Sequence, residues 1–351
     1  MSLPMHTLGS ALAVLLAVAL LGPGQAQGPA ARPDTSKLKP LIDMGPDDRD
    51  QGQQGGLYPG GRNDRPPAHE KAGLELAQKV RPLNAQGKPA RDGKIVLLSV
   101  GFSNTVQCFN GFMGAAAADK DVNPRVVLVN GAQGGRSAFM IQGPDDNRVG
   151  REYWRTWVPD HLKAAGVTPA QVQVVWLKET DARLGPGQLR MLGVEKYDCP
   201  LDQPFPKNAR TLQAELRRIV GVLPRLFPNV KLVYLSSRSY GAYARRPANP
   251  EPFSYETGFA VKWLIEDQIQ GAAGLNFDPG KGAVRAPWLS WGPYLWANGA
   301  QKRKDGFQSL PADYRENEGL HHSPQGMKKM GRLLLQFFKN DPTTKGWFCT
   351  R

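Results

Sequence analysis

The segment KIVLLSVGFSNT, residues 94–105, decides the fold of this 351-residue chain. After Lys94, the apolar residues at 95–98 follow one another without the alternation of a half-exposed strand, and the run ends at Gly101. A short continuous run of this kind predicts a strand that is buried on both faces, as in a parallel sheet. Ser103 follows two residues after the glycine, where a helical pattern begins. The segment therefore predicts a buried strand, a tight connection and a helix that starts beside a hydroxyl group.

Further apolar runs follow the first one, and helical patterns separate them. The runs are VVLV at 126–129, VQVVWL at 172–177 and KLVYLS at 231–236, and the helical patterns lie at 151–166, 209–227, 258–271 and 323–340. Strands that alternate with helices along a chain favour a parallel sheet with helices on both faces. The sequence therefore predicts one α/β domain, a three-layer α/β/α sandwich with a parallel sheet, over residues 93–342.

The N-terminal residues 1–26 differ from the rest because they carry no charged side chain. Their apolar run LGSALAVLLAVALLG is followed by the small-residue stretch GPGQAQG, which is the pattern of a secretory signal peptide. We expect cleavage after Ala26, a secreted or periplasmic protein, and no membrane span in the mature chain; the alternative is an uncleaved anchor. The Gly- and Pro-rich residues 27–92 predict an N-terminal extension or linker, and residues 343–351 a C-terminal tail.

The formal net charge of +14 raises the question of a polyanionic partner. The basic residues are scattered among acidic ones, and QKRKDG at 301–306 is the one tight cluster. Because no nucleic-acid motif accompanies them, we expect no specific nucleic-acid partner. Contact with acidic polysaccharide or another anionic surface polymer explains the charge equally well.

The chain contains three cysteines, Cys108, Cys199 and Cys349, which allow at most one internal disulfide. Their spacing matches no sulfur-based metal site. We expect one disulfide and one buried thiol, and the spacing does not say which two cysteines pair.

Chemically useful side chains follow the predicted strands, where a parallel sheet collects its functional groups. Ser103 is either a nucleophile at a helix N-terminus or a plain cap of that helix. The glycine pair in VNGAQGGRS, which ends at Gly135, permits either a close backbone approach to a ligand or a tight turn. Thr180 lies in WLKETDA, and ENEGLHHSPQG at 316–326 places Glu318 three residues before His321.

Taken in order, these blocks resemble the SGNH hydrolases, the GDSL-type esterase and lipase superfamily. GFSNT resembles the nucleophile block, NGAQGGRS the glycine block, KETDA the Gly-Glu-Ser-Asp form found among carbohydrate acetylesterases, and EGLHHSPQG the acid and histidine block. The resemblance covers roughly residues 93–342, points to an uncharacterised secreted bacterial branch and implies a flavodoxin-like fold. It implies Ser103 as nucleophile, His321 as base and Glu318 as orienting acid. The oxyanion hole would comprise Ser103, Gly135 and Thr180, with no cofactor or metal.

The chain departs from the family pattern at four positions. Phe102 stands where the name-giving motif has aspartate, which is not a proton carrier in that family. Lys178 and Thr180 stand where the third block has glycine and asparagine, and a lost oxyanion donor costs roughly 2.7–4 kcal/mol. Glu318 replaces aspartate, yet a glutamate can also hold the histidine tautomer.

The remaining acids and histidines near these blocks have plainer interpretations. Asp313 and Glu316 are weaker candidates for the orienting acid because neither has the three-residue spacing to His321. His322 is interpreted as a neighbour that faces the other way. The other two histidines are interpreted as structural or surface residues, His69 in a loop and His161 in a helix.

The sequence as a whole predicts a secreted serine esterase that removes a small acyl group, acetyl first, from a carbohydrate. The segment WLSWGPYLWANG at 288–299 predicts a strand and a cleft-lining loop, in which Trp288, Trp291 and Trp296 either stack on sugar rings or pack in the core. One alternative is a noncatalytic SGNH-fold protein that binds carbohydrate or surface polymer. Another is a basic polymer-binding protein for which the +14 charge is the functional feature.

Overall fold

A five-stranded parallel sheet forms the centre of the computed structural model, which describes residues 33–245 and 248–350. Its strands are β3 (Ile95–Gly101), β4 (Val126–Asn130), β5 (Val172–Lys178), β6 (Leu232–Leu235) and β7 (Trp288–Trp291). The predicted signal peptide lies outside the described residues. Within them, no helix has both the length and the apolar character needed to cross a membrane.

The order of the strands in the sheet is β4-β3-β5-β6-β7. Numbered along the chain within this sheet, that is the flavodoxin-like order 2-1-3-4-5. The chain leaves β3 first toward one edge of the sheet and then returns to β5 on the other side. Ligands in such sheets bind at this reversal, outside the carboxyl ends of the strands. The topology therefore places the expected site between the ends of β3 and β5.

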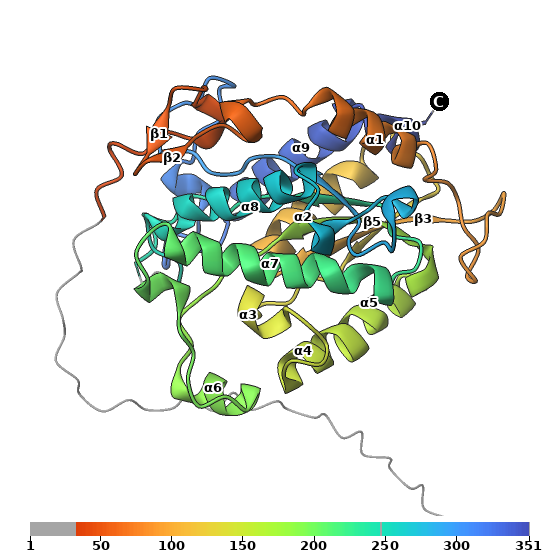
Figure 1. Cartoon of the computed structure of the whole chain (residues 1–351), viewed down its shortest axis with the longest axis horizontal. Helices are drawn as coiled ribbons and strands as arrows, with labels where there is room; N and C mark the ends of the chain where they lie inside the picture. Colours follow the sequence, from red (N-terminus) through yellow and green to blue (C-terminus); the bar gives the residue numbers. More distant parts are fainter. Residues whose placement is uncertain (1–32, 246–247, 351) are drawn as a thin grey trace, which may run out of the picture. The chain divides into compact units, whose positions relative to one another are not determined.

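Helices cover both faces of the sheet, and this confirms the predicted three-layer α/β/α sandwich (Figure 1). One face packs against α3 (Ala138–Ile141), α4 (Arg148–Glu152), α5 (Val158–Ala164), α7 (Lys207–Leu226) and α8 (Phe253–Ile269). The other packs against α1 (Pro67–Ala77), α2 (Ser103–Ala117), α9 (Pro324–Asn340) and α10 (Lys345–Phe348). A short helix, α6 (Pro186–Leu192), follows β5, and a two-stranded hairpin, β1 (Arg49–Asp50) with β2 (Gln53–Gln54), precedes α1.

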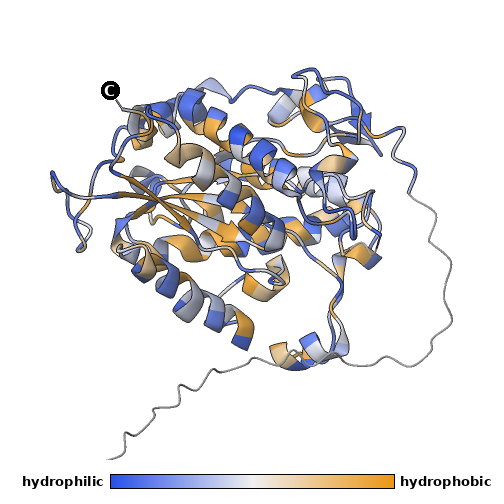
Figure 2. Ribbon diagram, turned by 180° about the vertical axis from the view of Figure 1, so that it is seen from behind, coloured by the Kyte–Doolittle hydropathy of each residue, from blue (hydrophilic) through white to orange (hydrophobic). Residues whose placement is uncertain are grey.

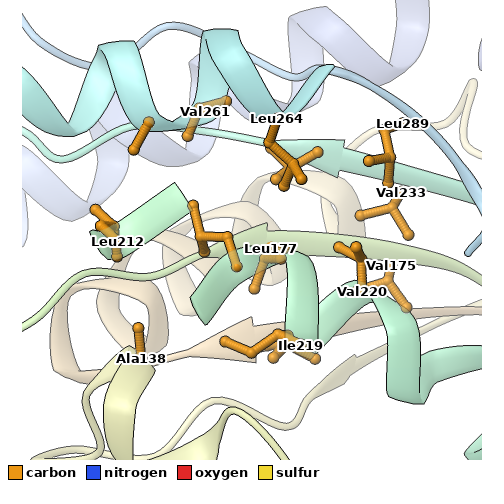
Figure 3. Close-up of a cluster of buried hydrophobic side chains, with 14 of the residues drawn as sticks. Ala138, Val175, Leu177, Leu212, Ile219, Val220, Val233, Val261, Leu264 and Leu289 are labelled. Carbon is orange, nitrogen blue, oxygen red and sulfur yellow. The ribbon is translucent and has the colours of Figure 1, made fainter. Parts of the chain in front are cut away.

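The strand that opens the domain is buried along its whole length, as its sequence predicts. Val96 and Leu98 point into the core on the α7 and α8 side, while Ile95 and Leu97 point into the core under α2 and α9. Figure 3 shows the first of these cores, where side chains of β5, β6 and α7 meet. The hydropathy colours show the same division, with apolar strands inside and hydrophilic helix surfaces outside (Figure 2).

The four predicted helices are present, with one irregularity. The patterns at 209–227, 258–271 and 323–340 correspond to α7, α8 and α9. The pattern at 151–166 is interrupted by a π-helical turn, Tyr153–Trp157, which separates α4 from α5. Trp154 is almost fully buried there and donates its indole N–H to the carbonyl of Ile141. The wider turn accommodates this large ring beside α3.

The described part of the N-terminal region, residues 33–92, packs against the domain. Leu41 is fully buried in the core next to α8, and the Tyr58 hydroxyl lies 2.9 Å from the Ser290 hydroxyl of β7. Arg65 forms an ion pair with Asp341 at the end of α9. At the opposite end of the chain, α10 buries its aromatic residues beneath α2. Both terminal segments therefore contribute to the folded core.

The three tryptophans that were candidates for sugar stacking belong to the core. Trp288, Trp291 and Trp296 are 0%, 2% and 0% exposed. Each indole N–H donates a hydrogen bond inside the protein, to the carbonyls of His69 and Leu57 and to the carboxylate of Glu251. The predicted strand is present as β7, but the idea of a cleft lined by these rings is wrong. A tryptophan ring can pack in a core as readily as on a binding surface when its N–H group has a hydrogen-bond acceptor there.

The cysteines are also placed differently from the expectation, because all three are free thiols. Cys108 is fully buried on the inner side of α2, Cys199 precedes a short 3-10 turn before α7, and Cys349 ends α10. The expected disulfide is therefore absent from the structure.

Two glycines let α2 and α9 pack with their backbones in contact. A Cβ added to Gly331 of α9 would lie 2.2 Å from the carbonyl carbon of Gly111 in α2. We expect Gly331→Ala to separate the helices and to lower the free energy of unfolding by about 1–3 kcal/mol, as overpacking does. Urea denaturation measures this change.

Gly114 provides the matched control on the same helix pair. A Cβ at that position meets no atom within 4 Å. Gly114→Ala should therefore raise the free energy of unfolding by roughly 0.5–1 kcal/mol through helix propensity. Equal effects of the two substitutions would contradict the close backbone contact.

Candidate active site

Ser103 lies where β3 ends and α2 begins, at the carboxyl edge of the sheet. Gly101 makes the sharp exit from the strand with a φ of 147°, and a Cβ there would lie 2.1 Å from the carbonyl oxygen of Lys178. The helix cap is Phe102, and no side chain caps the helix. Ser103 is partly exposed, so its hydroxyl stands at a helix N-terminus in reach of solvent. The helix dipole there favours a developing negative charge.

His321 lies in a tight loop between β7 and α9. The loop is closed by a bridge between Tyr314 and His322 and by the amide of Arg315, which donates to the carbonyl of His321 at 2.8 Å. Gly319 turns the loop with a φ of 68°. A Cβ there would come within 2.0 Å of the Tyr243 carbonyl oxygen, so the position requires glycine.

The loop brings Glu318 onto the imidazole of His321. Nδ1 of His321 lies 2.9 Å from each carboxylate oxygen of Glu318. An ionised carboxylate can only accept, so Nδ1 carries the proton and Nε2 is left as the acceptor nitrogen. Arg315 lies 3.5 Å from the same carboxylate. The longer glutamate side chain therefore reaches the imidazole ring.

Two hydrogen bonds join the first turns of α2 to the histidine loop, one on each side of His321. The side-chain amide of Asn104 donates to the carbonyl of Leu320 at 3.1 Å. The backbone N–H of His322 donates to the side-chain oxygen of Gln107 at 2.9 Å. Asn104 directly follows Ser103, Gln107 lies one helical turn further along α2, and Leu320 and His322 flank His321. The serine and the histidine therefore lie at the same edge of the sheet.

The glycine loop after β4 lies beside the serine. The amide of Gln133 donates to the carbonyl of Gly101 at 2.9 Å, which fastens the loop to the end of β3. A Cβ at Gly134 would lie 3.8 Å from the Cβ of Ser103. Gly135 follows with a φ of 74° and open space around it, so its backbone can face a ligand.

The third block, after β5, is buried beneath the glycine loop. Thr180 is 0% exposed, its carbonyl accepts from the amide of Ala138, and its hydroxyl has no hydrogen-bond partner among the described residues. Asp181 is also fully buried and accepts from the amide of Phe139 at 3.1 Å. These bonds make the block a support for the loop that carries Gly135. The role of Thr180 as an oxyanion donor stays a prediction.

Buried carboxyl groups surround this support on the α7 side of the sheet. Burial, reinforced by the charge of Asp181, raises the pKa of Glu179 and Glu215 well above the ordinary range, and burial raises the pKa of Asp181. Neutral carboxyl groups can both donate and accept hydrogen bonds. The neutral carboxyl groups can therefore share hydrogen bonds within the buried cluster. In the described part of the chain, no group of His, Cys, Asp or Glu side chains is arranged so that it could hold a metal ion.

The weaker candidates from the sequence have structural positions. Asp313 is fully buried, pairs with Lys329 and accepts from the amide of Leu310. Glu316 is exposed on the loop surface. Neither of these acids has a recorded bond to His321, whose acid partner is Glu318.

The other histidines serve the core. His322 is fully buried and packs against the ring of Tyr314. His69 lies in α1 instead of the expected loop, stacks on Trp288 and bonds the carbonyl of Leu289 at 2.7 Å. His161 lies in α5 with Nδ1 2.8 Å from the carbonyl of Trp157. All three act as structural residues in these contacts.

The buried histidine beside the site predicts an acid-sensitive fold. Burial, reinforced by the charges of Lys178 and Arg238, lowers the pKa of His322 from 6.5 to about 3. The unfolded chain therefore binds this proton below about pH 6.5 and the folded chain does not, so stability is full above that pH and falls as the pH decreases. We expect His322→Gln to reduce the pH slope of the unfolding free energy between pH 6 and 4 by about 1.4 kcal/mol per pH unit.

Denaturant titrations of the parent and the variant at several pH values measure that difference. His69, whose pKa burial lowers to about 4, contributes the same slope to both proteins and cancels. Identical slopes would mean that His322 is protonated in the folded state.

No protein-family model and no curated protein matches the chain. Three solved structures are distantly similar to it. The Bacillus subtilis protein YxiM has a TM-score of 0.34 and 10% identity over 72% of this chain and 57% of its own. A candidate acylhydrolase from Bacteroides fragilis has a TM-score of 0.36 and 9% identity over 78% and 97%. A gut microbial diltiazem-metabolizing enzyme has a TM-score of 0.36 and 12% identity over 75% and 49%. The chain thus spans about half the length of the first and third proteins. Because these similarities are weak, the function has to be inferred from the residues of this chain.

Proposed function

We propose that the protein is a serine ester hydrolase with Ser103 as nucleophile and His321 as base. The observation that carries the proposal is the pair of hydrogen bonds that holds the start of α2 against the loop that presents His321. Asn104 donates to the carbonyl of Leu320, and Gln107 accepts from the N–H of His322. The contact of His321 with Glu318 supports it further because it fixes the tautomer that a general base needs. Four residue types in matching roles at one sheet edge favour acyl transfer over a binding role alone.

In the proposed reaction, Nε2 of His321 takes the hydroxyl proton of Ser103 as its oxygen attacks the ester carbonyl carbon. The backbone N–H groups of Ser103 and Gly135 hold the resulting oxyanion, and the α2 dipole adds to their effect. The tetrahedral intermediate collapses to an acyl-enzyme, and the histidine returns the proton to the departing alcohol. Water, deprotonated by His321, then attacks the acyl group, and its proton goes to Ser103 as the acid leaves.

The finer proposal concerns the substrate, a small acyl group on a carbohydrate, with acetyl as the first choice. It rests on the likeness of KETDA at 178–182 to the acetylesterase block. The buried tryptophans no longer support it. Secretion through the N-terminal signal would bring the enzyme to extracellular glycans. Acetylated sugars offered beside short- and long-chain nitrophenyl esters test the acyl size and the alcohol separately.

A fluorophosphonate probe tests the serine mechanism itself. We expect the purified full-length protein to be labelled, with the adduct on the peptide that contains Ser103, and prior reaction with the probe to abolish hydrolysis of nitrophenyl acetate. Labelling of another serine, or hydrolysis that persists after complete labelling of Ser103, would contradict the assignment.

A noncatalytic binding protein of the same fold is the second candidate. The full burial of Thr180 favours it, because this residue stands in place of the asparagine that supplies an oxyanion donor in the family. A protein of this kind would bind carbohydrate or an anionic polymer without reacting with the fluorophosphonate. Two results together would favour the noncatalytic binding protein. The parent protein would not be labelled by the fluorophosphonate, and its salt-dependent binding to acidic polysaccharide would be unchanged in Ser103→Ala.

The contribution of Glu318, the orienting acid, to the proposed reaction can be measured by substitution. We expect Glu318→Gln to lower kcat by about 10²-fold, because an amide can donate to Nδ1 and thereby stabilise the wrong tautomer. Glu318→Asp shortens the reach by one methylene and is the matched control that keeps the charge. Its loss should be smaller, whereas equal losses in both variants would mean that reach, not tautomer, sets the rate.

A further inference from the structure

Two fully buried cations lie directly behind the serine, and the proposed reaction uses neither. Lys178 and Arg238 are 1% and 2% exposed. Lys178 ends β5, and Arg238 follows β6. Both approach the ring of Phe102, the neighbour of Ser103: the Lys178 Nζ lies 5.4 Å from the ring centroid and the Arg238 guanidinium carbon 4.9 Å.

These cations lack partners of opposite charge. Among the described residues neither makes an ion pair, and the Nζ of Lys178 and the Nε and Nη1 of Arg238 have no hydrogen-bond acceptor. Two acids lie near these cations. Glu251 is already occupied by the N–H groups of Gly241, Tyr255 and Trp296. Burial raises the pKa of Glu179 well above its ordinary range, so its neutral carboxyl group supplies no compensating charge. The face of an aromatic ring attracts a cation but does not neutralise its charge. Nor does it accept hydrogen bonds from the cation's N–H groups in the way that an anion does.

Other unpartnered donors belong to the same cluster. The hydroxyl of Tyr314 and the Nδ1 of His322 are buried without a hydrogen-bond partner among the described residues, and the two rings lie 5.2 Å apart. Lys178 and Arg238 both approach the Phe102 ring, Tyr314 packs against His322, and the charges of both cations help to lower the pKa of His322, so the four groups lie near one another. Asn104 contributes an unpartnered acceptor oxygen nearby in the chain. Donors and positive charge both exceed what the neighbouring acceptors can satisfy.

We propose that Lys178 and Arg238 bind a small inorganic monoanion of the halide class, held also by Tyr314 and His322. Water alone would accept hydrogen bonds but would leave two positive charges uncompensated in a region without solvent. A monoanion accepts from all four groups and reduces the net charge. A small anion also suits the burial, because the cations are closed off from larger carboxylates and phosphates.

Bromide is the probe for this site, in the full-length protein. Crystals soaked in bromide should give an anomalous peak in contact with Lys178 Nζ and the Arg238 guanidinium. In solution at constant ionic strength, with gluconate as the balancing anion, the unfolding temperature should rise with bromide concentration, because the folded state binds the ion. Lys178→Met and Arg238→Met should each lose most of that rise, while the surface control Lys328→Met keeps it.

The crystal experiment uses the parent protein, so it decides the matter even where a methionine variant fails to fold. No anomalous peak at the cluster, or ordered water there instead, overturns the proposal. So does a bromide response that is the same in the parent and in folded Lys178→Met and Arg238→Met variants. These readouts do not depend on ester hydrolysis, so the anion site stands or falls apart from the proposed enzymatic function.

Discussion

Replacing Ser103 with alanine is expected to lower kcat/KM for a small ester by about 10⁴-fold or more, the loss seen when a triad nucleophile is removed. The reason is the loss of the covalent path, because Nε2 of His321 would have no hydroxyl to activate. Remaining turnover would come from water held near the backbone N–H groups of the oxyanion site. Steady-state hydrolysis of nitrophenyl acetate measures the change.

The control for this variant is its stability. Ser103 does not cap α2 with its side chain, and it is partly exposed, so the alanine should change the unfolding temperature little. Ser36→Ala, at an exposed serine distant in sequence, provides the matched serine loss and should retain full activity. A Ser103→Ala protein that is folded and still active within tenfold of the parent would show that the hydrolysis proceeds through another group.

The placement of serine and histidine at one edge could be anticipated from the sequence because it depends on the backbone. Apolar runs without alternation set the strands, and parallel strands end at the same edge, so residues that follow β3 and precede α9 come together whatever their separation along the chain. The i,i+3 spacing of Glu318 and His321 is likewise a local property, and the turn at Gly319 brings the two side chains into contact.

The side-chain hydrogen bonds that join α2 to the histidine loop could not be predicted from a sequence pattern. Asn104 and Gln107 meet partners 216 and 215 positions away. One hint was present, since these two amides stand in the first turns of a helix that is mostly apolar further on, and buried polar groups need partners. Their acceptor and donor, however, are backbone atoms of Leu320 and His322, and backbone atoms leave no residue-specific trace in a sequence.

The burial of individual charged and aromatic residues could not be predicted from the sequence either. A lysine at a strand end, such as Lys178, is ordinarily read as solvent-exposed because its long stem can carry the charge to the surface. Here Lys178 is 1% exposed, and burial lowers its pKa to about 8. The tryptophans of β7 and of the loop after it are a similar case. The sequence does not show whether the acceptors of their indole N–H groups lie in the core or in a ligand.

Replacing His321 with alanine should remove activity to the same extent as Ser103→Ala, about 10⁴-fold or more in kcat/KM, since the two groups act as one unit. The double variant should therefore be no slower than either single variant. Fluorophosphonate labelling should fall with hydrolysis, because the probe needs the same activated oxygen. Both rates are measured on the same purified proteins.

The neighbouring histidine separates a chemical role from a structural one in this experiment. His321 is 25% exposed, and Glu318 keeps Arg315 as a partner when the ring is removed, so His321→Ala should unfold at nearly the parent temperature. His322 is fully buried, so His322→Gln should unfold earlier yet keep activity within about tenfold of the parent while it is folded. The opposite pattern, with activity lost at 322 and retained at 321, would place the base on the inner histidine and require the Ser239 hydroxyl, 3.5 Å from its Nε2, as the nearer nucleophile.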